Sequence, residues 1–496
     1  MKKKTLNKKM TKIILSLLIT WTMFPCSGAA QTSPKYEKTP DMQWEGYTGW
    51  TKEQRLYALS KFWMEAKYNF VYMSKIGANR WDSLYNAYIP KAIKDQNDYE
   101  FYRLMCRFCA FLNDGHTSVM INRPFNIITN YFADGWYLST EYVDGKILVT
   151  EVSKEKTKEV PLGSEIIELN GLPIKESLKM ECAHQFASTD MVALKRAGQQ
   201  LLRGLEFSTY KIKFRTPGGK EKDVTLHHEY LDGYDKLEIV KLHPEEKSDK
   251  NKNFLFKWYP KDVAYLKIGT FMRGRGVEEG IKNALPELQK RAKKIIIDLR
   301  DNEGGNSGFA ATIMGHFISG ERASDGRWST PTYNAAFASW GKSLQPKDTI
   351  NNPELKTFYL HYHNLAMHDG GLSNYTFSAN HPRVVVPTLI LTNYKTGSSC
   401  ENLLVMADGQ KHIKTIGETT SGSTGNPIGY TLIPGMFCKI CTIENLYPDG
   451  REFVGIGIKP DIEIRETVEN FIKGKDYVLE AALKHFGSKN KEEKKN

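Results

Sequence analysis

The sequence predicts a multidomain α+β protein, and two changes of periodicity along its 496 residues support this. Residues 52–113 place apolar side chains at helical spacing, which predicts a small helical bundle. The next part, to about residue 235, alternates apolar and polar positions in hairpin-like segments around one helical stretch, which predicts a compact β-rich module. From about residue 236 to 485 strands alternate with helices, which predicts an α/β core.

The first thirty residues predict a cleaved export signal. A basic leader, "MKKKTLNKKMTK", precedes a short apolar run, "IILSLLITWTMF", and the small residues of "CSGAA" precede Gln31. This order is typical of a secretory signal peptide cut after Ala30, so we expect the protein in a bacterial periplasm or on the outer surface. The apolar run is short for a bilayer span, and we expect no integral span in the mature chain. Cys26 raises lipid anchoring as an alternative that Pro25 fits poorly.

Composition and charge are those of an ordinary globular protein, with 40% hydrophobic and 25% charged residues. Removal of the six leader lysines would lower the net charge from +12 to +6. Part of the remaining charge lies in residues 486–496, which read as a disordered basic tail. The basic balance therefore gives little support for nucleic-acid binding, and we expect no such partner.

The helical domain is assigned to residues 31–118, with Thr51 as the expected N-cap of its first helix. Two C-x-x-C pairs, Cys106/Cys109 and Cys438/Cys441, invite a zinc site. The first pair, however, lies in an apolar helical run and the second in a strand-like alternation, so packing is the stronger interpretation. We expect no metal and no cofactor, while a disulfide stays open for an exported chain.

The β-rich module is assigned to residues 119–235. It begins with "GWYLSTEYVDGKILVTEV", a hairpin with an Asp-Gly turn, and ends with a second hairpin around "TPGG". Between them, "LGSEIIELNGLPI" resembles the strand-turn of PDZ domains, which bind extended peptides, often C-termini, by strand addition. Within the α/β core that follows, residues 320–385 are rich in Gly, Ser, Asn and aromatics and predict an insertion or lid.

Three short stretches fall where α/β folds place their sites. "IIIDLRDNEGGNSG" (295–308) offers glycine N–H groups to an anion, either a phosphate or a developing oxyanion. "NYKTGSSCENLL" (393–404) places hydroxyls at a helix N-terminus, as nucleophiles or merely as helix caps. "LNDGHTSV" contributes His116, a candidate base or an ordinary turn histidine.

Taken together, these stretches resemble the tail-specific (C-terminal processing) and tricorn-like serine peptidases. "IIDLRDNEGGNSG", "TGSSCE", "IGETTSGSTG" and "GIGIKPDIEI" resemble four motifs of that family in the same order, and the resemblance covers most of residues 45–470. It implies a ClpP/crotonase-like spiral fold for the α/β core. It also implies that the nucleophile is Ser398, three residues before Glu401.

The resemblance assigns the other site residues as well. The N–H of Ser399 would form an oxyanion hole with that of Gly304 or Gly305, and Cys400 would be a packing residue.

The general base departs from the commoner family pattern. Where the Ser/Lys branch has its lysine, this chain has Ser423, which cannot take a proton from Ser398 at neutral pH. The tricorn-like branch uses an upstream histidine, and "LNDGHT" resembles its motif, which implies His116 as the base. Glu452 is the expected orienting acid, with Asp449 and Asp461 as rivals.

The resemblance thus implies an exported serine endopeptidase that forms an acyl-enzyme and acts on protein or peptide C-termini. A catalytically inactive peptide-binding member and a carrier of apolar ligands remain as alternatives. The first predicts that His116 and Ser398 are out of reach of each other, and the second predicts a closed apolar pocket. The sequence leaves the oligomeric state open.

Overall fold

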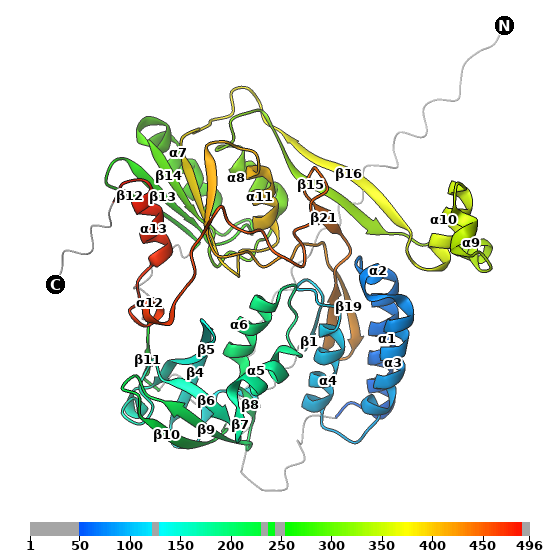
Figure 1. Cartoon of the computed structure of the whole chain (residues 1–496), viewed down its shortest axis with the longest axis horizontal. Helices are drawn as coiled ribbons and strands as arrows, with labels where there is room; N and C mark the ends of the chain where they lie inside the picture. Colours follow the sequence, from blue (N-terminus) through cyan, green and yellow to red (C-terminus); the bar gives the residue numbers. More distant parts are fainter. Residues whose placement is uncertain (1–48, 122–127, 230–236, 244–252, 489–496) are drawn as a thin grey trace, which may run out of the picture. The chain divides into compact units, whose positions relative to one another are not determined.

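A computed structural model describes residues 49–121, 128–229, 237–243 and 253–488 (Figure 1). The predicted signal peptide, with Cys26, and residues 489–496 of the predicted tail lie outside the described residues. Residues Trp50–Asn496 group as a single unit, so the domain boundaries predicted inside it, at 118 and 235, stay predictions.

Helices form the first part of this unit, as the periodicity predicts. They are α1 (Lys52–Asn69), α2 (Met73–Ile76), α3 (Ala78–Ala92) and α4 (Asp98–Ala110). Thr51 caps α1 as predicted, because its hydroxyl accepts the N–H of Gln54 while the Gln54 side chain accepts the N–H of Thr51. The buried rings of Trp81 and Phe108 stack with centroids 4.5 Å apart and fix α3 against α4.

The chain that leaves α4 is fastened to a ribbon from far along the sequence. Strand β1 (Ser118–Ile121) pairs antiparallel with β20 (Met436–Ile440), which pairs with β19 (Ile428–Ile433). The N–H of Cys441 donates to the Thr117 hydroxyl at 3.0 Å. Because both ends are held, by α4 and by β20, the turn at residues 113–117 has a fixed position.

The middle of the chain folds as an eight-stranded sheet with two helices. In sheet order the main path is β10 (Glu221–His227), β9 (Thr209–Arg215), β6 (Glu165–Leu169), β5 (Lys146–Ser153), β4 (Trp136–Val143) and β3 (Tyr131–Phe132). β11 (Ile239–Lys241) pairs with β5, β7 (Leu172–Pro173) pairs with β6, and β2 (Ile128–Thr129) pairs separately with β8 (Gly204–Leu205). The helices are α5 (Ile174–Cys182) and α6 (Asp190–Gln200).

The predicted Asp-Gly turn closes the β4–β5 hairpin. Asp144 and Gly145 both have positive φ, 46° and 83°, which suits the twist of a two-residue hairpin.

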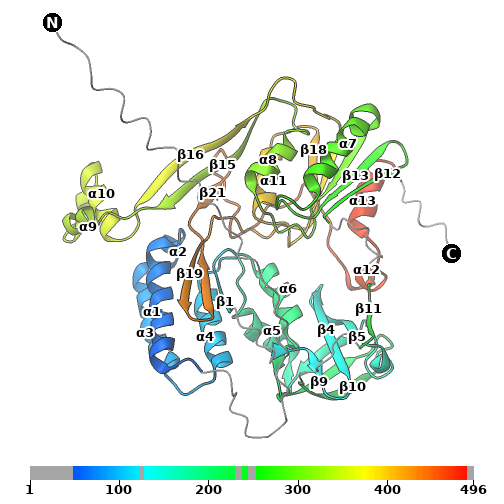
Figure 2. The same ribbon diagram turned by 180° about the vertical axis from the view of Figure 1, so that it is seen from behind.

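A six-stranded, mostly parallel sheet forms the C-terminal α/β core. Its order is β12 (Phe254–Tyr259), β13 (Val263–Ile268), β14 (Lys294–Asp298), β17 (Thr388–Thr392), β18 (Ile413–Gly417) and β22 (Ile462–Glu463), with only β12 antiparallel. Its helices include α7 (Val277–Arg291), α8 (Ser307–Met314), α11 (Ser399–Ala407), α12 (Val468–Ile472) and α13 (Tyr477–His485). Apolar residues of α13 pack on one sheet face, and α8 and α11 lie side by side (Figures 1 and 2).

Two turns of this core meet because their strands are neighbours. β14 ends at Asp298 and leads through the glycine turn into α8, while β17 ends at Thr392 and leads into α11. Since β14 and β17 pair in parallel, their carboxyl ends share one edge of the sheet. The two turns that the sequence singles out therefore lie together.

The predicted insertion forms a two-stranded ribbon. β15 (Arg322–Pro331) pairs antiparallel with β16 (Met367–Thr376), and α9 (Ala335–Gly341) and α10 (Pro353–Tyr362) lie at its far end (Figure 1). At its near end β15 also pairs with β21 (Glu444–Leu446) and contacts α11.

Cysteines occupy the predicted kinds of element. Cys106 and Cys109 are buried on α4 and Cys438 is buried on β20, with Cys441 just beyond it, and all are free thiols. Within the described ranges, no helix combines the length and apolarity needed to cross a bilayer.

Candidate active site

Ser398 sits on a strained turn between β17 and α11. Its φ is 56° and ψ −126°, a region that costs a non-glycine residue about 1–3 kcal/mol. A hydrogen bond from the N–H of Ser398 to the Ser423 carbonyl, at 2.8 Å, stabilises this strained conformation. Although Ser398 is the N-cap residue of α11, its side chain makes no capping bond. The hydroxyl is thus not used as a cap, the structural alternative that the sequence left open.

His116 reaches Ser398 from the turn between α4 and β1. Its Nε2 lies 3.1 Å from Ser398 Oγ, although 281 residues separate the two in sequence. This is hydrogen-bond distance. The pairing of β1 with β20 brings the histidine here.

The surroundings keep the His116 imidazole neutral. Burial, together with the nearby charges of Arg196 and Lys439, lowers its pKa to about 4. At neutral pH the ring therefore carries one proton and can accept another.

The second ring nitrogen of His116 faces a hydroxyl. Nδ1 lies 2.6 Å from Ser423 Oγ, so with a proton on Nδ1 the ring presents its lone pair at Nε2 to Ser398. In the sequence, Ser423 stands out only because it replaces the lysine expected from the Ser/Lys branch. No local pattern indicates its contact with His116.

The predicted orienting acid is wrong in position. Glu452 is exposed and pairs with Lys75 at 3.3 Å, whereas the ring nitrogens of His116 face Ser423 and Ser398. The rivals are also engaged elsewhere: Asp449 pairs with Arg451, and Asp461 accepts the N–H of Thr415 at 2.7 Å. The sequence placed Glu452 by its offset within a motif, and an offset does not give the direction of an exposed side chain.

Glu401 proves to be a structural support rather than only a marker in a motif. Its fully buried carboxylate accepts bonds from the Thr420 hydroxyl at 2.5 Å and from the N–H groups of Gly422 and Ser423 at 2.8 Å each. Burial raises the pKa of Glu401 to about 7, against these hydrogen bonds, which lower it. The carboxylate holds the 420–423 loop and thereby positions the Ser423 hydroxyl.

The N–H groups expected to form the oxyanion hole differ in whether they already have an acceptor. The N–H of Gly304 already donates to Asn302 Oδ1 at 2.9 Å, so Gly304 is not the glycine whose N–H is free for an oxyanion. Neither the N–H of Gly305 nor that of Ser399 donates to any residue in the described part of the chain. Gly304 instead provides close approach, since a Cβ there would lie 2.6 Å from the Ser398 Cβ.

Cys400 is fully buried and its thiol donates to the Asn302 carbonyl at 3.1 Å. Burial, with the neighbouring Glu401 carboxylate, raises its pKa well above the usual range. The thiol is a packing group, as expected.

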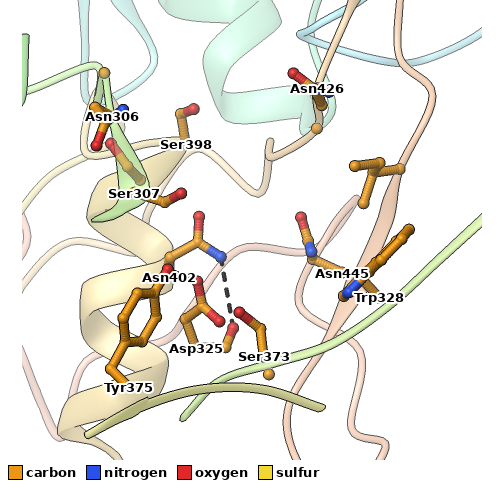
Figure 3. Close-up of a pocket in the computed structure, with 15 residues that line it drawn as sticks. Asn306, Ser307, Asp325, Trp328, Ser373, Tyr375, Ser398, Asn402, Asn426 and Asn445 are labelled. Carbon is orange, nitrogen blue, oxygen red and sulfur yellow. Dashed lines mark hydrogen bonds between the residues drawn. The ribbon is translucent and has the colours of Figure 1, made fainter. Parts of the chain in front are cut away.

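Two cavities flank Ser398. The larger, about 360 Å³, is lined by polar groups of α11, β15 and β16 (Figure 3). The smaller, about 220 Å³, contains His116, Ser423 and Lys395, together with Arg196 from α6. The sequence does not mark Arg196, nor Asp325 and Asn402 of the larger cavity, because no local pattern identifies a residue that lines a cavity from a distant element.

Comparisons with known proteins agree with this geometry. Residues 262–464 match the model of Peptidase family S41. No curated protein matches the chain.

Among solved structures, mature CPAF has a TM-score of 0.63 at 13% identity and covers 87% of this chain and 96% of its own. Mature CPAF complexed with lactacystin has a TM-score of 0.63 at 14% identity, with 88% and 98% covered. A photosystem II D1 C-terminal processing protease has a TM-score of 0.42 at 15% identity, with 86% and 98% covered.

At these identities the two CPAF structures show similarity of fold. The match at residues 262–464 includes Ser398, the glycine turn at Gly304 and Gly305, and the loop held by Glu401. Residues 262–464 are thus similar to the peptidases of family S41, and the chain is a serine-type peptidase, a hydrolase.

Proposed function

We propose that the chain is an exported serine endopeptidase that cleaves peptide bonds through an acyl-enzyme on Ser398, with His116 as general base. The observation that carries the proposal is the 3.1 Å contact between Ser398 Oγ and His116 Nε2. The proposal places the chain in the histidine-containing branch of the family. Its substrates are proteins or peptides, approached through their C-termini.

In the acylation step, Ser398 Oγ attacks the scissile carbonyl while its proton moves to His116 Nε2. The imidazolium then donates that proton to the leaving amine. Throughout, the Nδ1–H bond to Ser423 Oγ holds the ring in one tautomer and orientation. Water, deprotonated by His116, hydrolyses the acyl-enzyme and restores the Ser398 hydroxyl.

The tetrahedral intermediates carry their charge on the former carbonyl oxygen. The N–H groups of Ser399 and Gly305 are suited to donate to that oxygen because neither has another acceptor in the described ranges. Ser399 is also the first residue of α11, so the positive end of the helix dipole lies beside the charge.

Neither alternative function gains support. An inactive member predicts that His116 and Ser398 are apart, whereas they are in contact. An apolar-ligand carrier predicts a closed apolar pocket, whereas the larger cavity at Ser398 is lined by groups such as Asp325, Asn402 and Asn445.

Action on C-termini is supported by the cations of the smaller cavity. Arg196 and Lys395 lie there with His116, on the side where the leaving group must be protonated. A free carboxylate in the leaving peptide would find opposite charge at this position. Arg196 belongs to α6, so the middle module, PDZ-like in this proposal, contributes directly to the cavity.

Labelling with an alkyl fluorophosphonate tests the nucleophile and the base. We expect labelling of the wild type, none of Ser398→Ala and at least 100-fold slower labelling of His116→Ala. Cys400→Ala is the matched control, because it removes the adjacent thiol, and it should label normally. Labelling that survives Ser398→Ala, or a folded wild type that does not react, would refute the proposal.

A further inference from the structure

The larger cavity beside Ser398 contains a carboxylate that the peptidase chemistry does not use. Asp325, on β15, lies against Asn402, whose Nδ2 donates to the Asp325 carbonyl at 3.5 Å (Figure 3). Asn402 follows Ser398 by four residues on α11, or about 6 Å along the helix axis. Asp325 therefore packs against α11 about one helical turn from the nucleophile.

Local strand geometry turns Asp325 into this cavity. The pairing of β15 with β16 shifts register between Ser324 and Gly326, so Asp325 is the extra residue of a β-bulge. Gly326 has φ 113°, and a Cβ there would lie 2.0 Å from the Leu446 carbonyl oxygen, so only glycine allows the bend.

The Asp325 carboxylate is buried and incompletely paired. The residue is 7% exposed, and its Oδ2 accepts the Tyr375 hydroxyl at 3.2 Å. Its Oδ1 has no hydrogen-bond partner among the residues that the structure describes. Burial raises the pKa of Asp325, although the neighbouring hydroxyls of Ser373 and Tyr375 lower it in part.

The rest of the lining supplies no positive charge. The described residues around the cavity include neutral amides, hydroxyls and the Trp328 indole, but neither lysine nor arginine. A buried carboxylate with one free oxygen gains most from a cationic partner. The Trp328 ring adds a surface on which a cation is favoured.

The position of His116 identifies which part of a substrate enters this cavity. His116 lines the smaller cavity and is absent from the larger one, while Ser398 lines both. Because His116 must protonate the leaving amine, the leaving peptide lies over the smaller cavity. The larger cavity is left for the residue whose carbonyl becomes the acyl-enzyme.

We propose that Asp325 makes this cavity selective for a basic side chain, lysine or arginine, immediately before the scissile bond. The inference rests on the proposed serine-peptidase function. The cation of the substrate pairs with Oδ1 of Asp325, and its aliphatic part lies beside Trp328.

Matched peptides with arginine, lysine, citrulline, leucine or glutamate before the scissile bond test the proposal. Citrulline has nearly the shape of arginine but lacks its charge. We expect kcat/KM for arginine to exceed that for citrulline by about 10- to 100-fold, the range for a hydrogen bond to a charged group. Lysine should behave like arginine, and glutamate should be the poorest substrate.

Asp325→Asn should lower kcat/KM for arginine to about that for citrulline, a larger loss than the one for leucine. The matched control is Asp369→Asn on the same ribbon, an exposed aspartate paired with Arg327, which should keep the arginine preference. Equal cleavage of arginine and citrulline by the wild type would overturn the proposal without any variant. An equal loss on all peptides in Asp325→Asn would also overturn it, by revealing a structural role.

Fluorophosphonate labelling of Ser398 separates this failure from failure of the peptidase proposal. A small alkyl probe does not need the Asp325 cavity, so its reaction with the wild type reports on Ser398 and not on the specificity. If labelling depends on Ser398 but the peptides show no preference for arginine, only the proposed specificity is overturned. Absence of labelling would overturn the catalytic proposal on which it rests.

Discussion

Nδ1 of His116 lies 2.6 Å from Oγ of Ser423, in the loop that Glu401 holds. The other ring nitrogen, Nε2, faces Ser398 Oγ at 3.1 Å. The Ser423 hydroxyl therefore contacts the proposed base on the nitrogen that does not face the nucleophile, as a positioning residue would.

Ser423→Ala should lower kcat by about 10- to 100-fold, since the imidazole loses the hydroxyl that fixes its tautomer, a hydrogen bond worth about 1.5–3 kcal/mol when the ring is charged. Steady-state kinetics on a cleavable peptide measures this, and KM should change little. Thr424→Val is the control, because the Thr424 hydroxyl is buried without a partner among the described residues. Similar losses in both variants would assign the effect to packing of the loop.

Glu401→Gln should lower the free energy of unfolding by about 1–3 kcal/mol, because one N–H of the 420–423 loop would face an amide NH₂ instead of an oxygen. Denaturant titration measures the change. Glu452→Gln, at an exposed ion pair, should shift stability by less than about 0.5 kcal/mol and leave activity unchanged. Activity lost in Glu452→Gln would reinstate that residue as the orienting acid.

The rate of fluorophosphonate labelling should rise with pH through about 4 and stay level from pH 6 to 8, because the pKa of His116 is lowered to about 4 and only the neutral ring accepts the serine proton. The same shift makes His116 stabilise the fold above pH 6.5, a contribution lost as pH falls from 6.5 toward 4. Circular dichroism at each pH separates the two effects. An inflection near 6.5 would contradict the assigned environment.

Arg196→Gln should raise KM several-fold for a peptide with a free C-terminal carboxylate near the scissile bond and leave KM for the C-terminally amidated peptide almost unchanged. The reason is loss of the cation in the smaller cavity. Comparing the two peptides in one variant cancels any effect on His116 itself. If both peptides lose equally, Arg196 acts on the histidine rather than on the substrate.

Expression of the full chain with its leader should yield a mature protein that begins at Gln31, because the leader has the order of a cleaved export signal. N-terminal sequencing and cell fractionation measure this. A lipid-modified N-terminus at Cys26 would favour the anchored alternative, and an intact Met1 in the exported fraction would contradict cleavage.

Much of the fold follows from local pattern. The capping box at Thr51, the Asp-Gly hairpin turn and the strand–turn–helix around Ser398 depend on neighbours within a few residues, and their sequences predict them. Ser398 and His116 were identified through motifs that resemble a family. The prediction for Glu452 failed because an exposed side chain can pair with whichever charge lies nearby, here Lys75.

The sequence by itself determined the order of elements, the serine on a tight turn and the absence of the usual lysine. Only the tertiary structure decided which groups surround that serine. His116 comes from a turn held by β20, Ser423 from a loop held by Glu401, and Asp325 from a bulge in a distant ribbon. Strand pairing and burial bring together residues hundreds of positions apart, and no local periodicity records those contacts.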